Sequence, residues 1–280
     1  MKGDKKMKDI EYLYHYTSIE TLALILKNRT FRFNSLNKVD DIQEQEAADI
    51  KNAGQFCYVS SWTDDATESI PMWNMYATLN SGVRIKLRKN PFKMYENNAS
   101  ELAQACCKPV IDNKNGSPLK SLIPLNVMFQ KGFICPMVMG ENILHKVEYT
   151  SNVDKLYPKL VTSAKQQFSV DLGAFGKCKN LHWKFQNEWR YILIFLPLNL
   201  NQPIEKITLD GQVMANEIRL GVAAQPFPFY DLVLDDEAFR EMEITLSPRI
   251  TAGNRIIVEN LAEKYNSYAH IFESTLVGLI

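Results

Sequence analysis

One segment of this 280-residue chain joins an apolar strand to a row of alternating polar and apolar side chains. Residues 192–196 read Ile-Leu-Ile-Phe-Leu, which is typical of a buried strand. If residues 183–191 are also extended, every second side chain shares a face. We therefore expect Glu188 to lie on a polar face beside a core strand, where a carboxylate indicates a site. That face would carry Lys184, Gln186, Glu188 and Arg190, and the apolar face Phe185, Trp189 and Tyr191.

Composition limits the classes of protein that this chain can belong to. Apolar residues make up 46% and charged residues 23%, which is ordinary for a globular protein with a sizeable core. Lys+Arg and Asp+Glu both number 32, so no net charge attracts nucleic acid or an anionic membrane. The longest apolar stretch is far shorter than the roughly 20 residues that span a bilayer. Five irregularly spaced cysteines favour a reducing compartment, so we expect a cytoplasmic protein without a membrane partner.

The first ninety residues are predicted to alternate strands and helices. Residues 12–16 form an aromatic strand, and Thr17 with Glu20 has the spacing of a helix capping box. These patterns predict a single α+β domain over residues 10–280, with a flexible tail at 1–9. Split mixed β-sheets would surround a cleft, with residues 91–145 as an insertion or cap and further helices toward the C-terminus. Other strands are expected at 30–34, 55–60, 83–87, 146–149, 217–221 and 243–246, and other helices after Asp41, Ser69 and Pro158.

Several short motifs, taken in order, resemble a bacterial family known as domain of unknown function 2971. The motifs are Leu13–Thr17, Phe31–Phe33, Asp41–Glu44, Met72–Tyr76 followed by Gly82 and Val83, Trp183–Arg190, and Glu217–Gly221. The chain departs from the family pattern at Ile42 and Gln186, where proline and a second acidic residue are more usual. Glu188 is therefore the only acid of its row.

That family is similar in turn to ADP-ribosyltransferases, and the resemblance implies their fold and chemistry. It implies an NAD-consuming ADP-ribosyltransferase or NAD glycohydrolase, in the style of bacterial toxins and phage-defence effectors, with NAD as substrate. His15 would contact the ribose, Tyr76 would pack on nicotinamide, and Glu188 would be the catalytic acid. The acceptor, a protein or a nucleic acid, and any regulatory partner protein stay open. The residues expected to bind NAD are His15, Tyr16, Thr17, Trp73, Tyr76, Lys184 and Arg190.

Each candidate residue also has a structural interpretation. Glu188 can simply pair with a cation across the sheet, and His15 can be a hydrogen-bonded core histidine. Thr17 is more typical of a helix cap, and Trp73 with Tyr76 of a packed core. A non-enzymatic nucleotide- or ligand-sensing module and a purely structural protein therefore remain alternatives.

No metal site and no common nucleotide-binding loop are predicted. Cys178 and His182 are four residues apart, but no second pair at ligand spacing accompanies them. Neither a P-loop nor a Rossmann glycine motif is present in the sequence. Lys177, Lys179, Lys184 and Arg190 form a modest basic cluster that can meet phosphate or line a solvated strand edge.

Overall fold

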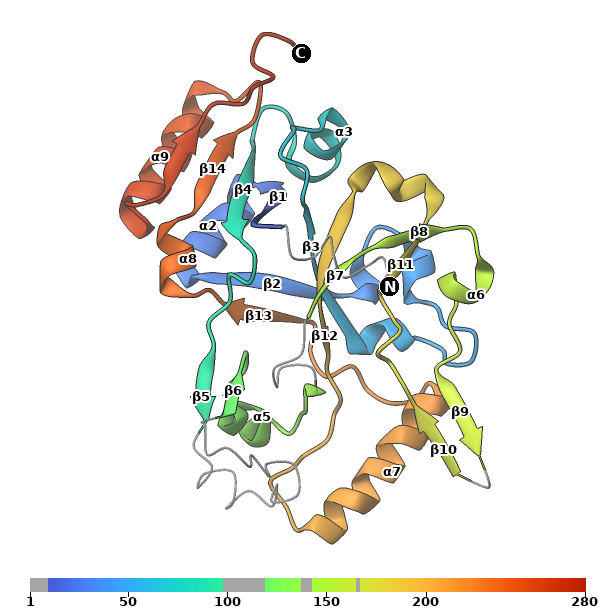
Figure 1. The fold of residues 1–280 in the computed structure, drawn as a ribbon. Coiled ribbons are helices and arrows are strands. Elements are labelled where there is room, and N and C mark those ends of the chain that lie inside the picture. Colours follow the sequence, from blue (N-terminus) through green and yellow to red (C-terminus); the bar gives the residue numbers. More distant parts are fainter. Residues whose placement is uncertain (1–9, 98–118, 137–142, 165–166) are drawn as a thin grey trace.

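The computed structural model describes residues 10–97, 119–136, 143–164 and 167–280, and it is a mixed α+β arrangement (Figure 1). Its main sheet has nine strands within these residues. They are β1 (Tyr12–Ser18), β2 (Thr30–Ser35), β3 (Cys57–Thr63), β4 (Gly82–Arg88), β7 (Leu144–Lys146), β12 (Glu188–Ile194), β13 (Phe229–Val233), β14 (Glu243–Leu246) and β15 (His270–Phe272).

Along the main sheet the strands follow the order β13-β2-β3-β1-β4-β14-β15, while β12 pairs with β3 and β7. All of these pairs are antiparallel except β14 with β15. Smaller two-stranded sheets pair β5 (Tyr95–Asn97) with β6 (Leu119–Ser121), β8 (Glu148–Thr150) with β11 (Cys178–Asn180), and β9 (Val161–Ala164) with β10 (Gln167–Val170). The β8–β11 pair is parallel, so the sheets are of mixed type.

The main sheet opens along one side of β3. On its other side β3 pairs with β12 over its whole length, from Cys57 to Thr63. On the open side, β1 meets β3 only at Thr63 and β2 meets it only at Tyr58 and Val59. In Figure 1, β2 and β13 run across the direction of β4, so the two parts of the sheet diverge. The backbone of β3 at residues 60–62 consequently borders a gap between β1 and β2.

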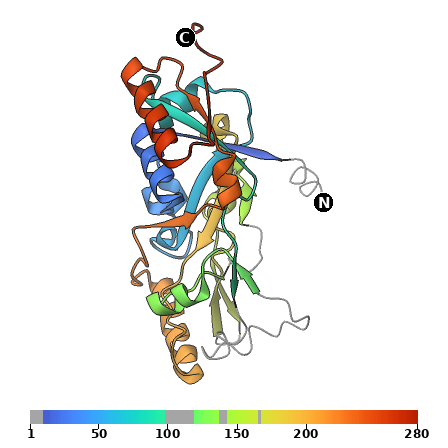
Figure 2. The ribbon, with the colours of Figure 1, turned by 90° about the vertical axis from the view of Figure 1, so that its left-hand side faces the viewer.

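Strand β12 is buried on both faces because it separates two hydrophobic cores. Trp189, Tyr191 and Leu193 lie in the larger core with helices α2 (Ile19–Asn28) and α9 (Ala252–Tyr265), which pack together on one side of the sheet (Figure 2). Ile192 and Ile194 lie in the smaller core under α7 (Ile204–Leu220). The other helices are α3 (Ile70–Met72), α5 (Leu125–Lys131), α6 (Val153–Leu156) and α8 (Asp236–Arg240). None of the helices in the described ranges is long and apolar enough to cross a membrane.

Two predicted elements were of the wrong type. The helix expected after Pro158 is the β9–β10 hairpin, since Val161 and Val170 are β-branched residues that fit a strand and are partly buried against the smaller core. The strand expected at 217–221 is the last turn of α7. There Pro203 at the start and Gly221 in the left-handed conformation at the end delimit the helix.

Two of the predicted helix starts were wrong in their details, whereas the helix expected after Ser69 begins at Ile70. Thr17 lies inside β1, and the cap of α2 is Ser18, whose hydroxyl accepts a hydrogen bond from the Thr21 amide at 3.2 Å. Asp41 caps only a single 3-10 turn, Ile42–Gln45, and not the longer helix that was expected after it. The strands expected at residues 12–16, 30–34, 83–87 and 243–246 are confirmed, with small shifts at their ends.

Residues 1–9, predicted to be a tail, lie outside the described residues, as do 98–118 and 137–142 of the expected insertion. The part of residues 91–145 that the structure describes contains β5, β6, α5 and most of β7. The domain organisation therefore stays a prediction.

Candidate active site

A cavity of about 240 Å³ lies at the gap between β1, β2 and β3. Its lining comes from segments that are far apart in the sequence. Tyr14, His15 and Tyr16 come from β1, Arg32 and Asn34 from β2, Val59, Ser60, Ser61 and Trp62 from β3, and Glu188 and Arg190 from β12; Lys38, Val39, Asp40, Met72, Tyr76, Lys179 and Gln186 complete it. The cavity lies where residues 60–62 of β3 pair with neither β1 nor β2, which leaves room for side chains and a ligand.

Five of the eight predicted site residues line this cavity: His15, Tyr16, Tyr76, Glu188 and Arg190. The other three do not. Thr17 is buried at the end of β1, opposite Val83 of β4. Trp73 is fully buried, and its Nε1 donates a hydrogen bond to Glu68 at 2.9 Å.

Lys184 lies outside the cavity because the segment before β12 is not extended. Residues Leu181–Gln186 form a 3-10 helix, and Asn187 then adopts a left-handed conformation with φ of 42°. The expected alternation of faces therefore holds only from Glu188 onward. Lys184 points to solvent, while Gln186 turns inward and lines the cavity.

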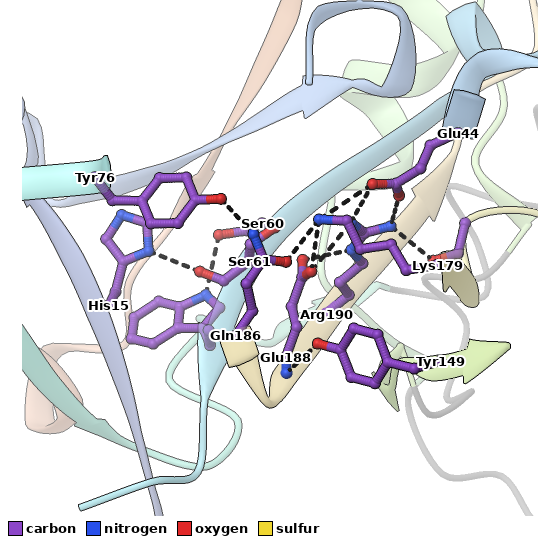
Figure 3. A network of polar contacts seen from close by, with 12 residues as sticks. His15, Glu44, Ser60, Ser61, Tyr76, Tyr149, Lys179, Gln186, Glu188 and Arg190 are labelled. Atoms are coloured by element: carbon purple, nitrogen blue, oxygen red, sulfur yellow. Dashed lines mark hydrogen bonds and ion pairs between the residues drawn. The ribbon is translucent and has the colours of Figure 1, made fainter. Parts of the chain in front are cut away.

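Next to the cavity lies a buried cluster of four charged side chains, the charge quartet: Glu44, Lys179, Glu188 and Arg190 (Figure 3). All of them except Glu44 also line the cavity. Arg190 donates to Glu188 through Nε at 2.5 Å and to Glu44 through both terminal nitrogens, and a further bond reaches the Gly176 carbonyl at 3.2 Å. Lys179 lies 3.1 Å from Glu188 and 3.2 Å from Glu44. Two negative and two positive charges thus neutralise one another in a site that excludes most water.

The quartet keeps Glu188 ionised. Burial alone would raise the pKa of this carboxyl, but the charges of Arg190 and Lys179, with hydrogen bonds from Arg190 and Ser61, lower it to about 2. Both oxygens already accept hydrogen bonds from cations. Glu188 is therefore a weak base and a permanent negative charge at the cavity wall.

His15 is held as a neutral imidazole. Its Nδ1 lies 2.8 Å from the Ser61 carbonyl oxygen, which can only accept, so Nδ1 carries the proton. The ring packs on Phe31 and Trp62, with centroids 5.3 and 5.1 Å away, and burial lowers its pKa. Within the described part of the chain Nε2 has no hydrogen-bond partner. It is thus an acceptor available to a ligand hydroxyl.

Tyr76 lines the cavity and is connected to the charge quartet by hydrogen bonds through Gln186. Its hydroxyl accepts a hydrogen bond from the Gln186 amide, and the Gln186 oxygen accepts one from Lys179 at 2.8 Å. Burial, together with the charges of Asp40 and Glu188, raises the pKa of Tyr76, so its hydroxyl stays neutral. An aromatic ring held in this way can stack on a flat ligand group.

Sequence reasoning missed two members of the quartet. Glu44 was interpreted as part of a helix start, yet it lies against Arg190, 146 residues away. Lys179 was noted only in a basic cluster that could line a strand edge, but it is 5% exposed. The one available signal was that basic cluster next to Glu188, since a buried carboxylate needs cationic partners. No group of three or more His, Cys, Asp and Glu side chains suited to a metal ion occurs in the residues that the structure describes.

No protein-family model matches the chain, and neither a curated protein nor a solved structure matches it.

Proposed function

We propose that this chain cleaves the bond between nicotinamide and ribose in NAD, as an ADP-ribosyltransferase or an NAD glycohydrolase. The observation that carries the proposal is that Glu188 and His15, which are 173 residues apart in sequence, line one cavity. We propose further that the sheet opening at β3 is an ADP-ribosyltransferase-like split, which the divergence of β1 and β2 from β3 supports.

The chemistry needs a negative charge beside the sugar. When the glycosidic bond breaks, its electron pair leaves with nicotinamide, and positive charge develops on the ribose. A carboxylate that stays ionised stabilises this charge more in the transition state than in the ground state. Glu188 suits this electrostatic role better than that of a general base, because its pKa of about 2 makes it a poor proton acceptor. The acceptor's own proton would leave to water.

The other cavity residues fit the remaining parts of NAD. The free Nε2 of His15 accepts a hydrogen bond from a ribose hydroxyl, and Tyr76 offers a ring face for nicotinamide. Arg190 uses its donors on Glu44, Glu188 and Gly176. The pyrophosphate is therefore assigned to the outer part of the cavity, where Lys38 is exposed to solvent.

The experiment is to incubate the purified full chain with NAD and to measure released nicotinamide by chromatography. The wild type should release nicotinamide. Glu188→Gln should lower kcat by about 100-fold or more, because the loss of one group that stabilises charge in the transition state typically has an effect of this size. The matched control is Glu243→Gln, which removes a strand glutamate paired with Lys86 outside the cavity. Circular dichroism and thermal unfolding confirm that each variant is folded. Release that is equally fast in Glu188→Gln would contradict the assignment.

A non-enzymatic ligand-sensing module is the second candidate, because both oxygens of Glu188 are already occupied by cations. In that case NAD or another nucleotide should raise the melting temperature without being turned over. At a ligand concentration 100 times the dissociation constant, binding should stabilise the folded state by about 2.7 kcal/mol. Nicotinamide release by the wild type would exclude this alternative.

A further inference from the structure

The chain beyond β15 lies against the segment that carries Tyr76. Figure 1 shows the C-terminus near α3, at the same end of the molecule. We call residues Ser274–Leu276 the C-terminal clip. They contact residues of segment 68–77, more than 190 positions earlier in the sequence.

Glu68 is the centre of this contact. The carboxylate of Glu68 accepts hydrogen bonds from the Ser274 hydroxyl at 2.6 Å, the Thr275 amide at 2.6 Å and the Thr275 hydroxyl at 2.9 Å. It also accepts one from the Trp73 indole at 2.9 Å. Although burial opposes it, these bonds hold the pKa of Glu68 below its usual value. One buried charge therefore fastens the clip and the Tyr76 segment to each other.

Apolar packing adds to this attachment. Leu276 packs on a small cluster formed by Tyr16, Trp73 and Ala77. Tyr16 meets Trp73 edge-on with centroids 5.0 Å apart, and its hydroxyl accepts a hydrogen bond from the Ser69 amide at 3.0 Å. The clip thus packs on the Tyr76 segment, and none of its three residues is among those that line the cavity.

The segment held in this way has an unfavourable backbone. Residues Trp73–Ala77 form a π-helical turn, a rare geometry. Thr78, a β-branched residue, follows with φ of 66° and ψ of 147°, a region that such residues avoid. Conformations of this kind persist only where the surrounding structure enforces them. The bonds through Glu68 hold the start of this segment, and hydrogen bonds of the Thr78 hydroxyl with Asn80 and Ser81 hold its end.

We propose that the C-terminal clip is a positioning element of the cavity, which holds Tyr76 in the wall through Glu68 and Trp73. From Tyr76 the contact continues to Gln186 and then to Lys179 in the charge quartet. Glu68 is accordingly a positioning residue, because it touches the Tyr76 segment and not the cavity. The effect of the clip on the backbone is independent of any reaction, whereas its effect on turnover rests on the proposed function.

The backbone part is tested by hydrogen exchange with mass spectrometry on the full chain. The double variant Ser274→Ala, Thr275→Val removes two donors to Glu68 and leaves the cavity residues untouched. Amides of residues 69–78 should exchange at least tenfold faster, because two hydrogen bonds to a charged group are lost and the loss of one alone is expected to give about that factor. Amides of β12 should not change. Unchanged exchange at 69–78, or equal acceleration in both segments, would overturn the proposal.

Two control variants separate the clip from general damage to this end of the chain. Glu273→Gln removes the neighbouring surface pair with Arg255 and does not touch Glu68. Thr275→Ser keeps the hydroxyl that Glu68 accepts. Both should exchange like the wild type at residues 69–78, and acceleration in either would contradict the assignment to Glu68.

The functional part uses NAD as the probe. In the double variant KM should rise severalfold while kcat changes little, because Tyr76 is assigned to binding of the nicotinamide ring. An unchanged KM would contradict the positioning role. If the wild type does not cleave NAD, the proposed function fails, and the exchange experiment still decides on the clip.

Discussion

At the scale of single residues, Arg190 is the side chain on which the site depends most. It is 1% exposed and contacts both buried carboxylates, Glu44 and Glu188. A buried charge without a partner costs several kcal/mol, so each carboxylate is stable in its place only while the guanidinium remains. The two cations of the quartet therefore keep Glu188 ionised beside the cavity.

Arg190→Met should destabilise the fold by about 3–5 kcal/mol, because it leaves two buried carboxylates facing Lys179 alone. Urea unfolding measures this change. Arg255→Met is the control, since its partner Glu273 is largely exposed and such pairs contribute about 1 kcal/mol or less. Equal effects of the two substitutions would contradict the buried quartet.

Stability should also fall in acid. The pKa of Glu188 is about 2 in the folded chain and near 4.5 in the unfolded chain, so its contribution is complete above pH 4.5 and is lost as the pH falls toward 2. The difference corresponds to about 3 kcal/mol. Burial lowers the pKa of His15, and stability therefore also declines as the pH falls through 6.5.

Unfolding at several pH values between 7 and 2 tests this account. Glu188→Gln cannot titrate and should have a shallower slope below pH 4.5 than the wild type. Identical slopes would mean that Glu188 does not carry the buried charge described here.

The sequence predicted the site only in part, for a reason visible at single residues. His15, Tyr76, Glu188 and Arg190 were predicted because each belongs to a local motif. Glu44 and Lys179 were not, since their roles arise from long-range contacts that local patterns do not encode. Lys184 was misplaced because it lies in the 3-10 helix Leu181–Gln186, so the alternation of faces begins only at Glu188.

At the scale of elements, sequence patterns predicted the secondary structure correctly where the pattern of apolar residues fitted one type of element. They failed where the same pattern fitted both a helix and a strand. The aromatic strand β1 and the strand β4 after Gly82 were predicted. The spacing of apolar residues beyond Pro158 suits a helix as well as a hairpin. In the structure the start of the hairpin is bound by Asp49, whose carboxylate accepts hydrogen bonds from the amides of Leu160 and Val161, each at 2.9 Å. Such tertiary partners override weak local preference.

Replacing glycine by alanine should change the stability of the chain in opposite directions at two positions, Gly211 and Gly82. Gly211 lies within α7, and no atom is within 4 Å of an added Cβ, so Gly211→Ala should stabilise the chain by about 0.5–1 kcal/mol. At Gly82 an added Cβ would lie 2.1 Å from the Ala77 carbonyl oxygen. Gly82→Ala should therefore destabilise by about 1–3 kcal/mol, by overpacking. Thermal unfolding of both variants measures the difference, and loss of stability in Gly211→Ala would argue against the helix.

At the scale of the whole molecule, the decisive feature is the opening of the sheet at β3. An α+β fold followed from the alternation of predicted elements, and the mixed sheets agree with it. The place of the opening did not follow, because it depends on where β1 and β2 leave β3, at Thr63 and Val59. Packing determines which distant strands pair, and the sequence of either strand alone does not predict the pairing.

In the proposed function, this opening receives a nucleotide sugar between His15 and Glu188. The most direct measurement is a crystal structure of the full chain with ADP-ribose. We expect density for the ribose in the cavity, with a hydroxyl within hydrogen-bond distance of His15 Nε2 and the sugar against the Glu188 carboxylate. ADP-ribose bound at another surface, with this cavity empty, would contradict it.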